Sequence, residues 1–379
     1  MNIAFVTSHL IKSLQWLWFA EELKNRDINQ VHIIINETKP VLIDELNEAG
    51  ICAYYLVHKN FWSHFINFVK TIKIYKKHNI NLVHTSLPYG NLIGLLSAFF
   101  TGIKARLTTC ENVSWAHDFR HNKQLIVDKL TFFLSQKIIV TTDSAEEYMH
   151  LHWSYTKPKL QVIYHSVKIS AYENVSLQRQ NRLRDRFKIF EGDFIVGMVA
   201  RLEYWKGHQY AVEAISVLIK EIPSIRLKIF GSGGSGELAL KKQLENNPLL
   251  QKHVEWCGFV EDPIALYKLF DVHLHVPINK YIETGGITIL EGMASQCAQV
   301  LTLSGYSNQT AIDHENALVV DYENSEEIAQ ALKALFLNKD LRQTIALNAS
   351  IKVRAEFGND VKAEKHFVLY KDLYERFIN

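Results

Sequence analysis

A chain of 379 residues is too long for one ordinary domain, and its hydrophobic fraction of 47% and charged fraction of 22% are globular values that allow a sizeable core. The formal net charge of +2 is far too small for a general nucleic-acid binder, although it is compatible with a phosphate ligand or a membrane surface. We therefore expect no nucleic-acid partner.

The four cysteines are scattered and form no C-x-x-C pair, which argues against a structural zinc site and against a disulfide framework. They fit a reducing compartment. Residues 1–7 lack the basic and long apolar segments of a signal peptide and predict a first strand. The most apolar helical pattern, Leu92–Ile103, is too short to cross a bilayer. We expect a cytoplasmic protein that is soluble or lies on the cytoplasmic face of the inner membrane.

The first half of the chain alternates short apolar runs with longer helical patterns. Strands separated by helices in this way predict right-handed crossovers and a parallel sheet. The predicted strands are Ile3–Thr7, Val31–Ile35, Ala53–Val57, Leu82–Ser86, Ala105–Thr109, Lys137–Thr142 and Leu160–Tyr164. The predicted helices lie near residues 14–26, 61–78, 89–102, 121–134 and 143–152.

The alternation stops between Lys168 and Glu191, where the chain is polar and carries four arginines close together. We expect residues 171–191 to be a linker that could hold a short helix. A second alternating series follows. Its predicted strands are Phe194–Val199, Leu227–Phe230, Val254–Cys257, Val272–Val276, Gln299–Leu303 and Ala317–Val320. Its last helices are predicted near residues 324–337, 339–354 and 359–377.

Two successive doubly wound domains are therefore predicted, with a ligand in the cleft between them at the carboxyl ends of the strands. Residues 1–170 form the first domain and residues 192–358 the second. The last helix, residues 359–379, is expected to return to the first domain.

Two cations follow the first strand of the second domain. Arg201 and Lys206 lie on the loop that ends at Gly207 and enters a helix near His208. Cations beside a helix N-terminus make a good receptor for a diphosphate. Ordinary surface charges on a loop are the alternative interpretation.

A glycine-rich turn follows the next strand. Gly231, Gly233 and Gly236 satisfy the pattern G-x-G-x-x-G, and glycine lets the backbone approach a phosphate closely. A lone match is weak evidence, because a plain strand-to-helix turn can carry the same glycines and Glu255 is a poor candidate for the acidic partner.

Glu283 and Glu291 are separated by seven residues that include a glycine pair. Glu283 precedes the turn of Gly285 and Gly286, and Glu291 lies one turn inside the helix that follows. The backbone N–H groups of the turn and of the first helical residues can then face an anion. The alternative is a helix with ordinary acidic residues near its start, which explains Glu291 less well because its neighbours are apolar.

Taken together, these motifs resemble those of the family 4 retaining glycosyltransferases of the GT-B fold, in which two Rossmann-like doubly wound domains face each other across a cleft. The resemblance covers nearly the whole chain and is most specific in the second half. Arg201-x4-Lys206-Gly207 is similar to the donor-diphosphate motif, and Glu283-x7-Glu291 with the following Gly-Met-Ala is similar to the E-x7-E motif. The resemblance implies an acceptor-binding first domain and a nucleotide-sugar-binding second domain.

The resemblance also implies a role for each motif residue. The catalytic residues would be Arg201 and Lys206, which neutralise the departing diphosphate, and Glu283, which contacts the sugar. Glu291 would hold the ribose hydroxyls. The sequence contains no D-x-D motif, so neither a metal nor another cofactor is required. The expected donor-binding residues are Arg201, Lys206, Gly231, Gly233, Gly285, Gly286, Ile287, Thr288 and Glu291.

The chain departs from the family pattern at positions that would face the sugar and the acceptor. The segment Leu10–Ser13 replaces the usual glycine pair after the first strand, and Glu111 stands where the family often has a histidine. Gln309 stands where a glutamate is common. The candidate residues on the acceptor side are His9, Ser13, Glu111 and His117.

Two further features have competing interpretations. His273 and His275 alternate along a strand, but no third ligand is evident, so no metal site is expected. The helix near residues 61–78 carries an apolar face and four lysines in its later turns. Such a helix either packs on the core with a solvated basic face or lies on anionic lipid.

The sequence therefore predicts transfer of a hexose or N-acetylhexosamine, with retention, from a nucleotide-sugar whose expected nucleotide is UDP. The acceptor would be a glycan or a lipid-linked molecule in surface polysaccharide or lipopolysaccharide biosynthesis, with a peripheral contact to the inner membrane. Three alternatives stay open: a UDP-sugar 2-epimerase, a non-catalytic nucleotide- or glycan-binding protein of the same fold, and a dinucleotide-dependent oxidoreductase.

Overall fold

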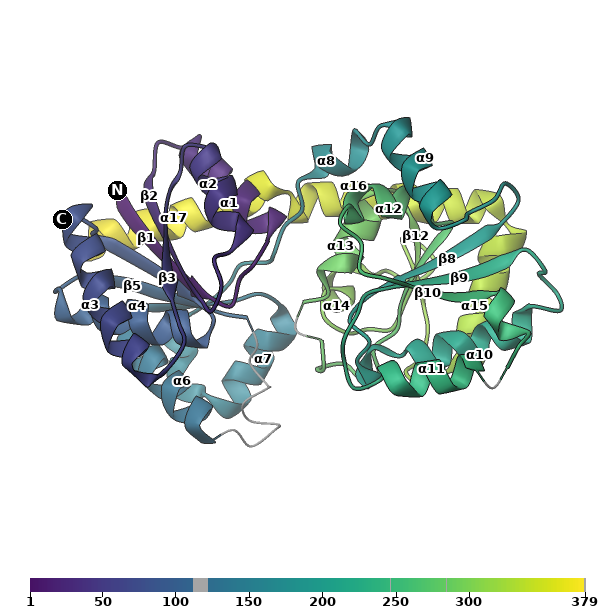
Figure 1. Cartoon of the computed structure of the whole chain (residues 1–379), viewed down its shortest axis with the longest axis horizontal. Helices are drawn as coiled ribbons and strands as arrows, with labels where there is room; N and C mark the ends of the chain where they lie inside the picture. Colours follow the sequence, from purple (N-terminus) through teal and green to yellow (C-terminus); the bar gives the residue numbers. More distant parts are fainter. Residues whose placement is uncertain (112–121, 246, 284, 378–379) are drawn as a thin grey trace. The chain divides into compact units, whose positions relative to one another are not determined.

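The structure, a computed structural model, describes residues 1–111, 122–245, 247–283 and 285–377. The chain forms two compact units (Figure 1). The first unit consists of Met1–Ser166 and Asn359–Asn379, and the second of Val167–Gly358. Each unit is built around one parallel sheet.

The first unit has a seven-stranded sheet in the order β3-β2-β1-β4-β5-β6-β7. Every predicted strand and helix of this half is present. Among the described residues, the short helix α2 and a 3-10 helix at Ser154–Lys159 were not predicted. The strands are β1 (Asn2–Ser8), β2 (Asn29–Asn36), β3 (Cys52–Val57), β4 (Leu82–Ser86), β5 (Ala105–Cys110), β6 (Lys137–Val140) and β7 (Leu160–Val162). The helices are α1 (Leu14–Lys24), α2 (Val41–Glu48), α3 (Phe61–Lys77), α4 (Pro88–Phe100), α6 (Asn122–Leu134), α7 (Asp143–His152) and α17 (Asn359–Phe377).

Helices cover both faces of this sheet. Ile3 and Phe5 of β1 belong to a core with α1 and α17, whereas the intervening Ala4 and Val6 belong to a core with α3 and α4. A parallel sheet buried on both faces needs such near-continuous apolar strands. The sheet extends in opposite directions from the neighbours β1 and β4, so the carboxyl ends of these two strands form a topological switch point.

Helix α17 brings the end of the chain to the first unit. Tyr370 and Leu373 are buried in the same core as Phe5. The Tyr370 hydroxyl lies 2.7 Å from Nδ1 of His84, and Asn359 Nδ2 donates to the Trp18 carbonyl at 2.9 Å. The last helix is therefore part of the first unit both through apolar packing and through hydrogen bonds.

The second unit has a six-stranded sheet in the order β10-β9-β8-β11-β12-β13. Its strands are β8 (Phe194–Val199), β9 (Ile225–Phe230), β10 (Val254–Gly258), β11 (Val272–His275), β12 (Ala298–Leu301) and β13 (Leu318–Val319). Its helices are α8 (Ile169–Glu173), α9 (Leu177–Arg186), α10 (His208–Leu218), α11 (Glu237–Glu245), α12 (Pro263–Leu266), α13 (Ile287–Ala294), α14 (Ser307–Thr310), α15 (Ser325–Leu337) and α16 (Lys339–Phe357). Of the helices in the described ranges, none is long and apolar enough to cross a membrane.

The predicted linker, residues 171–191, is instead part of the second unit. Helix α9 is fixed by Arg179, whose Nε and Nη2 donate to both carboxylate oxygens of Asp262 at 2.8 and 2.6 Å. Leu183 and Phe187 are buried. The linker prediction is wrong. Charged residues on the outer side of α9 dominate the composition of this segment, so the few apolar residues that pack inward did not produce a recognisable helical pattern.

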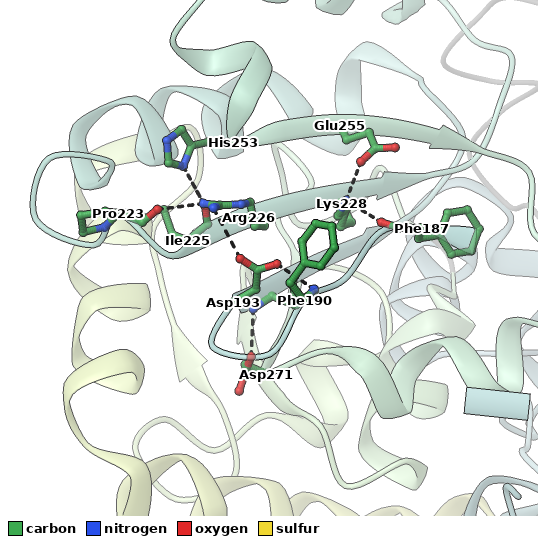
Figure 2. Close-up of polar contacts among 11 residues, drawn as sticks. Phe187, Phe190, Asp193, Pro223, Ile225, Arg226, Lys228, His253, Glu255 and Asp271 are labelled. Carbon is green, nitrogen blue, oxygen red and sulfur yellow. Dashed lines mark hydrogen bonds and ion pairs between the residues drawn. The ribbon is translucent and has the colours of Figure 1, made fainter. Parts of the chain in front are cut away.

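The amino ends of the strands in the second unit are held by polar contacts (Figure 2). Arg226 at the start of β9 donates to His253 Nδ1 at 3.1 Å and pairs with Asp193 at 3.4 Å. Asp271, just before β11, accepts from the backbone N–H of Ile195 at 2.9 Å. The buried Lys228 ties β9 to the end of α9 by donating to the Phe187 carbonyl at 2.8 Å. These contacts stabilise the sheet at the amino ends of its strands. Ligands are therefore expected at the opposite, carboxyl ends.

Candidate functional site

The predicted donor residues of the second unit meet where β8 and β11 end. These neighbouring strands form the switch point of the sheet, since the chain leaves β8 toward β9 and β11 toward β12. Gly207, with φ +79°, lies against the end of β11, because a Cβ at this position would come within 2.0 Å of the Val276 carbonyl oxygen. Only glycine allows the Arg201–Gly207 loop to approach so closely.

The two predicted cations of this loop differ in their surroundings. The Arg201 side chain is 69% exposed and makes a 3.4 Å ion pair with Glu203. The Lys206 side chain is only 11% exposed, and its ammonium pairs with the Glu283 carboxylate. Lys206 is therefore a largely buried cation next to Glu283, whereas Arg201 is exposed to solvent.

Glu283 is buried and stays ionised. Burial by itself would raise the pKa of its carboxyl, but the Lys206 ammonium and His275 outweigh burial and lower the pKa to about 2. His275 Nε2 lies 3.6 Å from Glu283 Oε2. Burial lowers the pKa of His275, so we expect this ring to be neutral and to orient the carboxylate through a polar contact. The sequence motifs indicated Glu283 and Lys206 separately but not their pairing, and they gave no sign that His275 lies beside Glu283.

The glycine turn leads directly into helix α13. Gly286 has φ +75° and precedes the first helical residue, Ile287. The backbone N–H groups of Ile287 and Thr288 lie in the first turn, where a helix has no internal acceptors for them. Gly285 is held by its carbonyl, which accepts from the Tyr306 N–H at 2.7 Å. The helix N-terminus, with its partial positive charge, thus lies beside the Lys206–Glu283 pair.

Glu291 is held by two tyrosines. Its carboxylate accepts hydrogen bonds from the hydroxyls of Tyr172, at 3.0 Å, and Tyr267, at 2.8 Å. Burial raises the pKa of Glu291, and the two hydroxyls act against this rise. Each carboxylate oxygen has a second lone pair, so the predicted contact with ribose hydroxyls is compatible with both bonds. Sequence reasoning missed Tyr172 and Tyr267, because neither lies in a motif.

The glycine-rich turn after β9 packs against the Arg201 loop. A Cβ at Gly231, where φ is +141°, would come within 1.9 Å of the Ala200 carbonyl oxygen. The Ser235 N–H donates to Glu203 at 3.1 Å. Gly231 therefore allows the glycine-rich turn and the Arg201 loop to pack closely together. Gly233, with φ +66°, has no described neighbour within 4 Å of its Cβ position and remains the better candidate for a ligand contact.

Within the parts of the chain that are described, no three His, Cys, Asp or Glu side chains gather so that they could hold a metal ion. His273 and His275 are both buried. Burial lowers the pKa of His273 to about 3.

The first unit contains a cavity of about 270 Å³ at the carboxyl ends of its strands. Two of the four predicted acceptor-side residues, Ser13 and Glu111, line it. Ser13 also caps α1, since its hydroxyl accepts from the Trp16 N–H at 3.2 Å. His9 is exposed just beyond β1 and does not line this cavity, and His117 lies outside the described residues.

Glu111 belongs to a charged cluster that the sequence did not indicate. His165 Nε2 lies 2.9 Å from the Glu111 carboxylate. Burial would raise the pKa of Glu111, but His165 and Lys362 together lower it. Burial lowers the pKa of Lys362, which comes from α17, to about 8. The cluster combines residues more than 190 positions apart, so no local pattern could have revealed it.

Comparison with known proteins finds related glycosyltransferases. The model of the "Glycosyl transferases group 1" family matches residues 179–351, and that of "Glycosyltransferase Family 4" matches residues 17–171. The capsular polysaccharide biosynthesis glycosyltransferase CapM of Staphylococcus aureus is 21% identical over 312 residues, 80% of each chain. The alpha-monoglucosyldiacylglycerol synthase of Acholeplasma laidlawii is 25% identical over 209 residues, 55% of this chain and 50% of that protein.

The fold is shared with solved glycosyltransferase structures. HepE of Anabaena, solved in complex with UDP-glucose, superposes with a TM-score of 0.82 at 17% sequence identity, covering 98% of this chain and all of the other. Both units of this chain are built on doubly wound parallel sheets. This protein therefore belongs to the group 1, family 4-type glycosyltransferases of the GT-B fold.

Proposed function

We propose that the protein transfers a hexose or N-acetylhexosamine, with retention, from a UDP-sugar to a glycan or lipid-linked acceptor in the synthesis of a surface polysaccharide or glycolipid. The observation that carries this proposal is the pairing of Lys206 with Glu283 beside the N-terminus of α13. A buried cation, a buried carboxylate and helix-terminal N–H groups at one switch point suit a diphosphate with an attached sugar.

The proposed reaction breaks the bond between the anomeric carbon and the β-phosphate oxygen and forms a bond from that carbon to the acceptor oxygen. The acceptor hydroxyl attacks from the face that the diphosphate leaves, and its proton passes to the departing phosphate oxygen. Arg201, Lys206 and the N–H groups of Ile287 and Thr288 would stabilise the negative charge that develops there. Glu283 would hold a sugar hydroxyl, and Glu291 the ribose.

The choice of UDP is supported by the Anabaena structure, which contains UDP-glucose. The choice of acceptor is supported by the two relatives, one named for capsular polysaccharide and the other for a glucosyldiacylglycerol. A lipid-linked acceptor would place the protein in the cytoplasm, at the inner membrane.

An NMR-monitored panel of UDP- and GDP-sugars, incubated with the protein and a bacterial lipid extract, tests the proposal. Free UDP should appear with one donor, and Glu291→Gln should abolish its release because the variant loses the charged acceptor for the ribose hydroxyls. Glu213→Gln, an exposed carboxylate on α10, is the matched control and should release UDP normally. Epimerisation of the donor without an acceptor would identify an epimerase instead, and binding without turnover would identify a non-catalytic protein.

A further inference from the structure

The cavity of the first unit lies at the switch point of its sheet. Thr7 near the end of β1 and Ser86 at the end of β4 line it, and α17 contributes Lys362. Trp16 and Phe19 of α1 supply aromatic walls. With a volume of about 270 Å³, the cavity is near the small end of the range for ligand pockets, which suits a single sugar residue.

The Lys362 side chain places a cation in this cavity. Among the residues that the structure describes, none forms a hydrogen bond or an ion pair with its ammonium. The Nζ atom lies 4.9 Å from the centroid of the Phe19 ring. Burial lowers the pKa of Lys362 to about 8, against the opposing charge of Glu111, so the group is still mainly protonated at neutral pH. Its three donors suit the oxygen atoms of an anionic ligand.

Two histidines beside Lys362 are neutral and already hydrogen-bonded. His84 Nδ1 lies 2.7 Å from the Tyr370 hydroxyl, and its Nε2 lies 2.7 Å from the Thr109 hydroxyl. His366 Nδ1 donates to the Lys362 carbonyl at 2.9 Å. Burial lowers the pKa of His84 to about 3 and the pKa of His366 well below its ordinary value. The positive charge that a ligand meets on this side of the cavity therefore comes from Lys362.

Glu111 limits how much negative charge the cavity accepts. Its carboxylate lies 2.9 Å from His165 Nε2. Burial would raise the pKa of Glu111, but the charges of His165 and Lys362 lower it, so the group is ionised. One further negative charge would be balanced by Lys362, whereas a second would be repelled by Glu111. A carboxylate fits this balance better than a phosphate monoester, which carries about two charges at neutral pH.

We propose that this cavity binds the carboxylate of an acidic sugar, a uronic acid, at the accepting end of the acceptor, and that Lys362 donates hydrogen bonds to it. The aromatic walls contact the carbon face of the sugar ring. The inference deepens the proposed function and rests on it for naming the ligand as the acceptor. Binding of the carboxylate needs no transfer, so it can be measured without a donor.

A ligand-observed NMR titration of the full chain tests the proposal. The probes are methyl glucuronide and methyl galacturonide, and each is compared with the methyl glucoside or methyl galactoside that lacks the carboxylate. One uronide should bind about tenfold or more tightly than its neutral counterpart, which is the effect of one charge-assisted hydrogen bond. Glucose 6-phosphate is a third probe, which tests for a phosphate instead.

Substitutions of Lys362 should remove this preference. Lys362→Gln and Lys362→Met should bind the uronide no more tightly than the neutral sugar, because both lose the charge. Lys371→Gln is the matched control, since Lys371 lies on the same helix, is 63% exposed and pairs with Glu375. The control should bind like the unaltered protein. Thermal unfolding checks that the variants are folded, and Lys362→Met keeps most of the apolar stem of the lysine.

The pH gives a second readout. Raising it from about 7 to about 9.5 should weaken uronide binding, because the Lys362 ammonium loses its proton in this range. Glu111, His84 and His366 face the same ammonium, and their lowered pKa values keep their charges unchanged over this range. His165 also lines the cavity, so the same titration is repeated with Lys362→Gln, which should show no such loss.

Several outcomes would overturn the proposal. They are no binding of either uronide, equal binding of the uronide and its neutral counterpart, and an unchanged preference in both Lys362 variants. Tighter binding of glucose 6-phosphate would assign the cavity to a phosphate. Release of UDP is a separate readout. Uronide binding without UDP release from any donor would refute the proposed function alone, and UDP release without uronide binding would refute this inference alone.

Discussion

At the scale of single residues, the proposed chemistry depends most on Lys206. Lys206→Ala removes the buried cation that would meet the leaving diphosphate, so we expect turnover to fall about 100-fold or more. Lys333→Ala is a matched control, because Lys333 only pairs with Glu221 at the surface and should leave turnover unchanged. Turnover should be measured as UDP release, with thermal unfolding to check the fold. Near-normal release by Lys206→Ala would remove this residue from the site.

The depressed pKa of Glu283 predicts a pH-dependent contribution to stability. The carboxyl has a pKa of about 2 in the folded protein and an ordinary value of 4.5, so its stabilisation is present above pH 4.5 and is lost as the pH falls toward 2. The full contribution of Glu283 ionisation to the free energy of unfolding is up to about 3 kcal/mol.

Urea unfolding of the protein and of Glu283→Gln, between pH 6 and pH 3.5, measures this contribution. The difference in unfolding free energy should shrink at the lower pH. A difference that stays constant with pH would show that Glu283 keeps its ordinary pKa.

At the scale of elements, α9 should behave as part of the second unit. Leu183→Ala removes a side chain that is 4% exposed and should lower the unfolding free energy by about 2–4 kcal/mol. Leu177→Ala, on the same helix but 74% exposed, should change it by less than about 0.5 kcal/mol. Urea unfolding monitored by circular dichroism distinguishes the two. Equal small effects would restore the interpretation of this segment as a linker.

At the scale of the whole molecule, the chain ends in the unit in which it begins. Leu373→Ala on α17 opens a cavity in the core that contains Ile3 and Phe5, so it should weaken the first unit by about 2–4 kcal/mol. Val368→Ala, exposed on the same helix, is the control. Hydrogen exchange should show lost protection in β1 and β5 but not in β9. Equal protection in both variants would mean that α17 contributes little to this core.

The sequence by itself determined the two parallel sheets and the positions of the donor motifs. Strand and helix patterns repeat over a few residues, and Arg201, Lys206, Glu283 and Glu291 lie in contiguous motifs, so both signals can be read locally. The same reasoning failed for α9, because its apolar residues are few and its charges dominate the composition of the segment.

Only the tertiary structure decided which side chains meet. Lys206 and Glu283 are 77 residues apart, and Tyr172 reaches Glu291 across 119 residues. The sequence also could not decide which face of α3 is buried, since Asn67 and Thr71 lie inward with Tyr75 while Trp62 and Phe65 are exposed. Long-range pairing and the choice of packing face depend on the partner surface, and a partner surface exists only once the chain has folded.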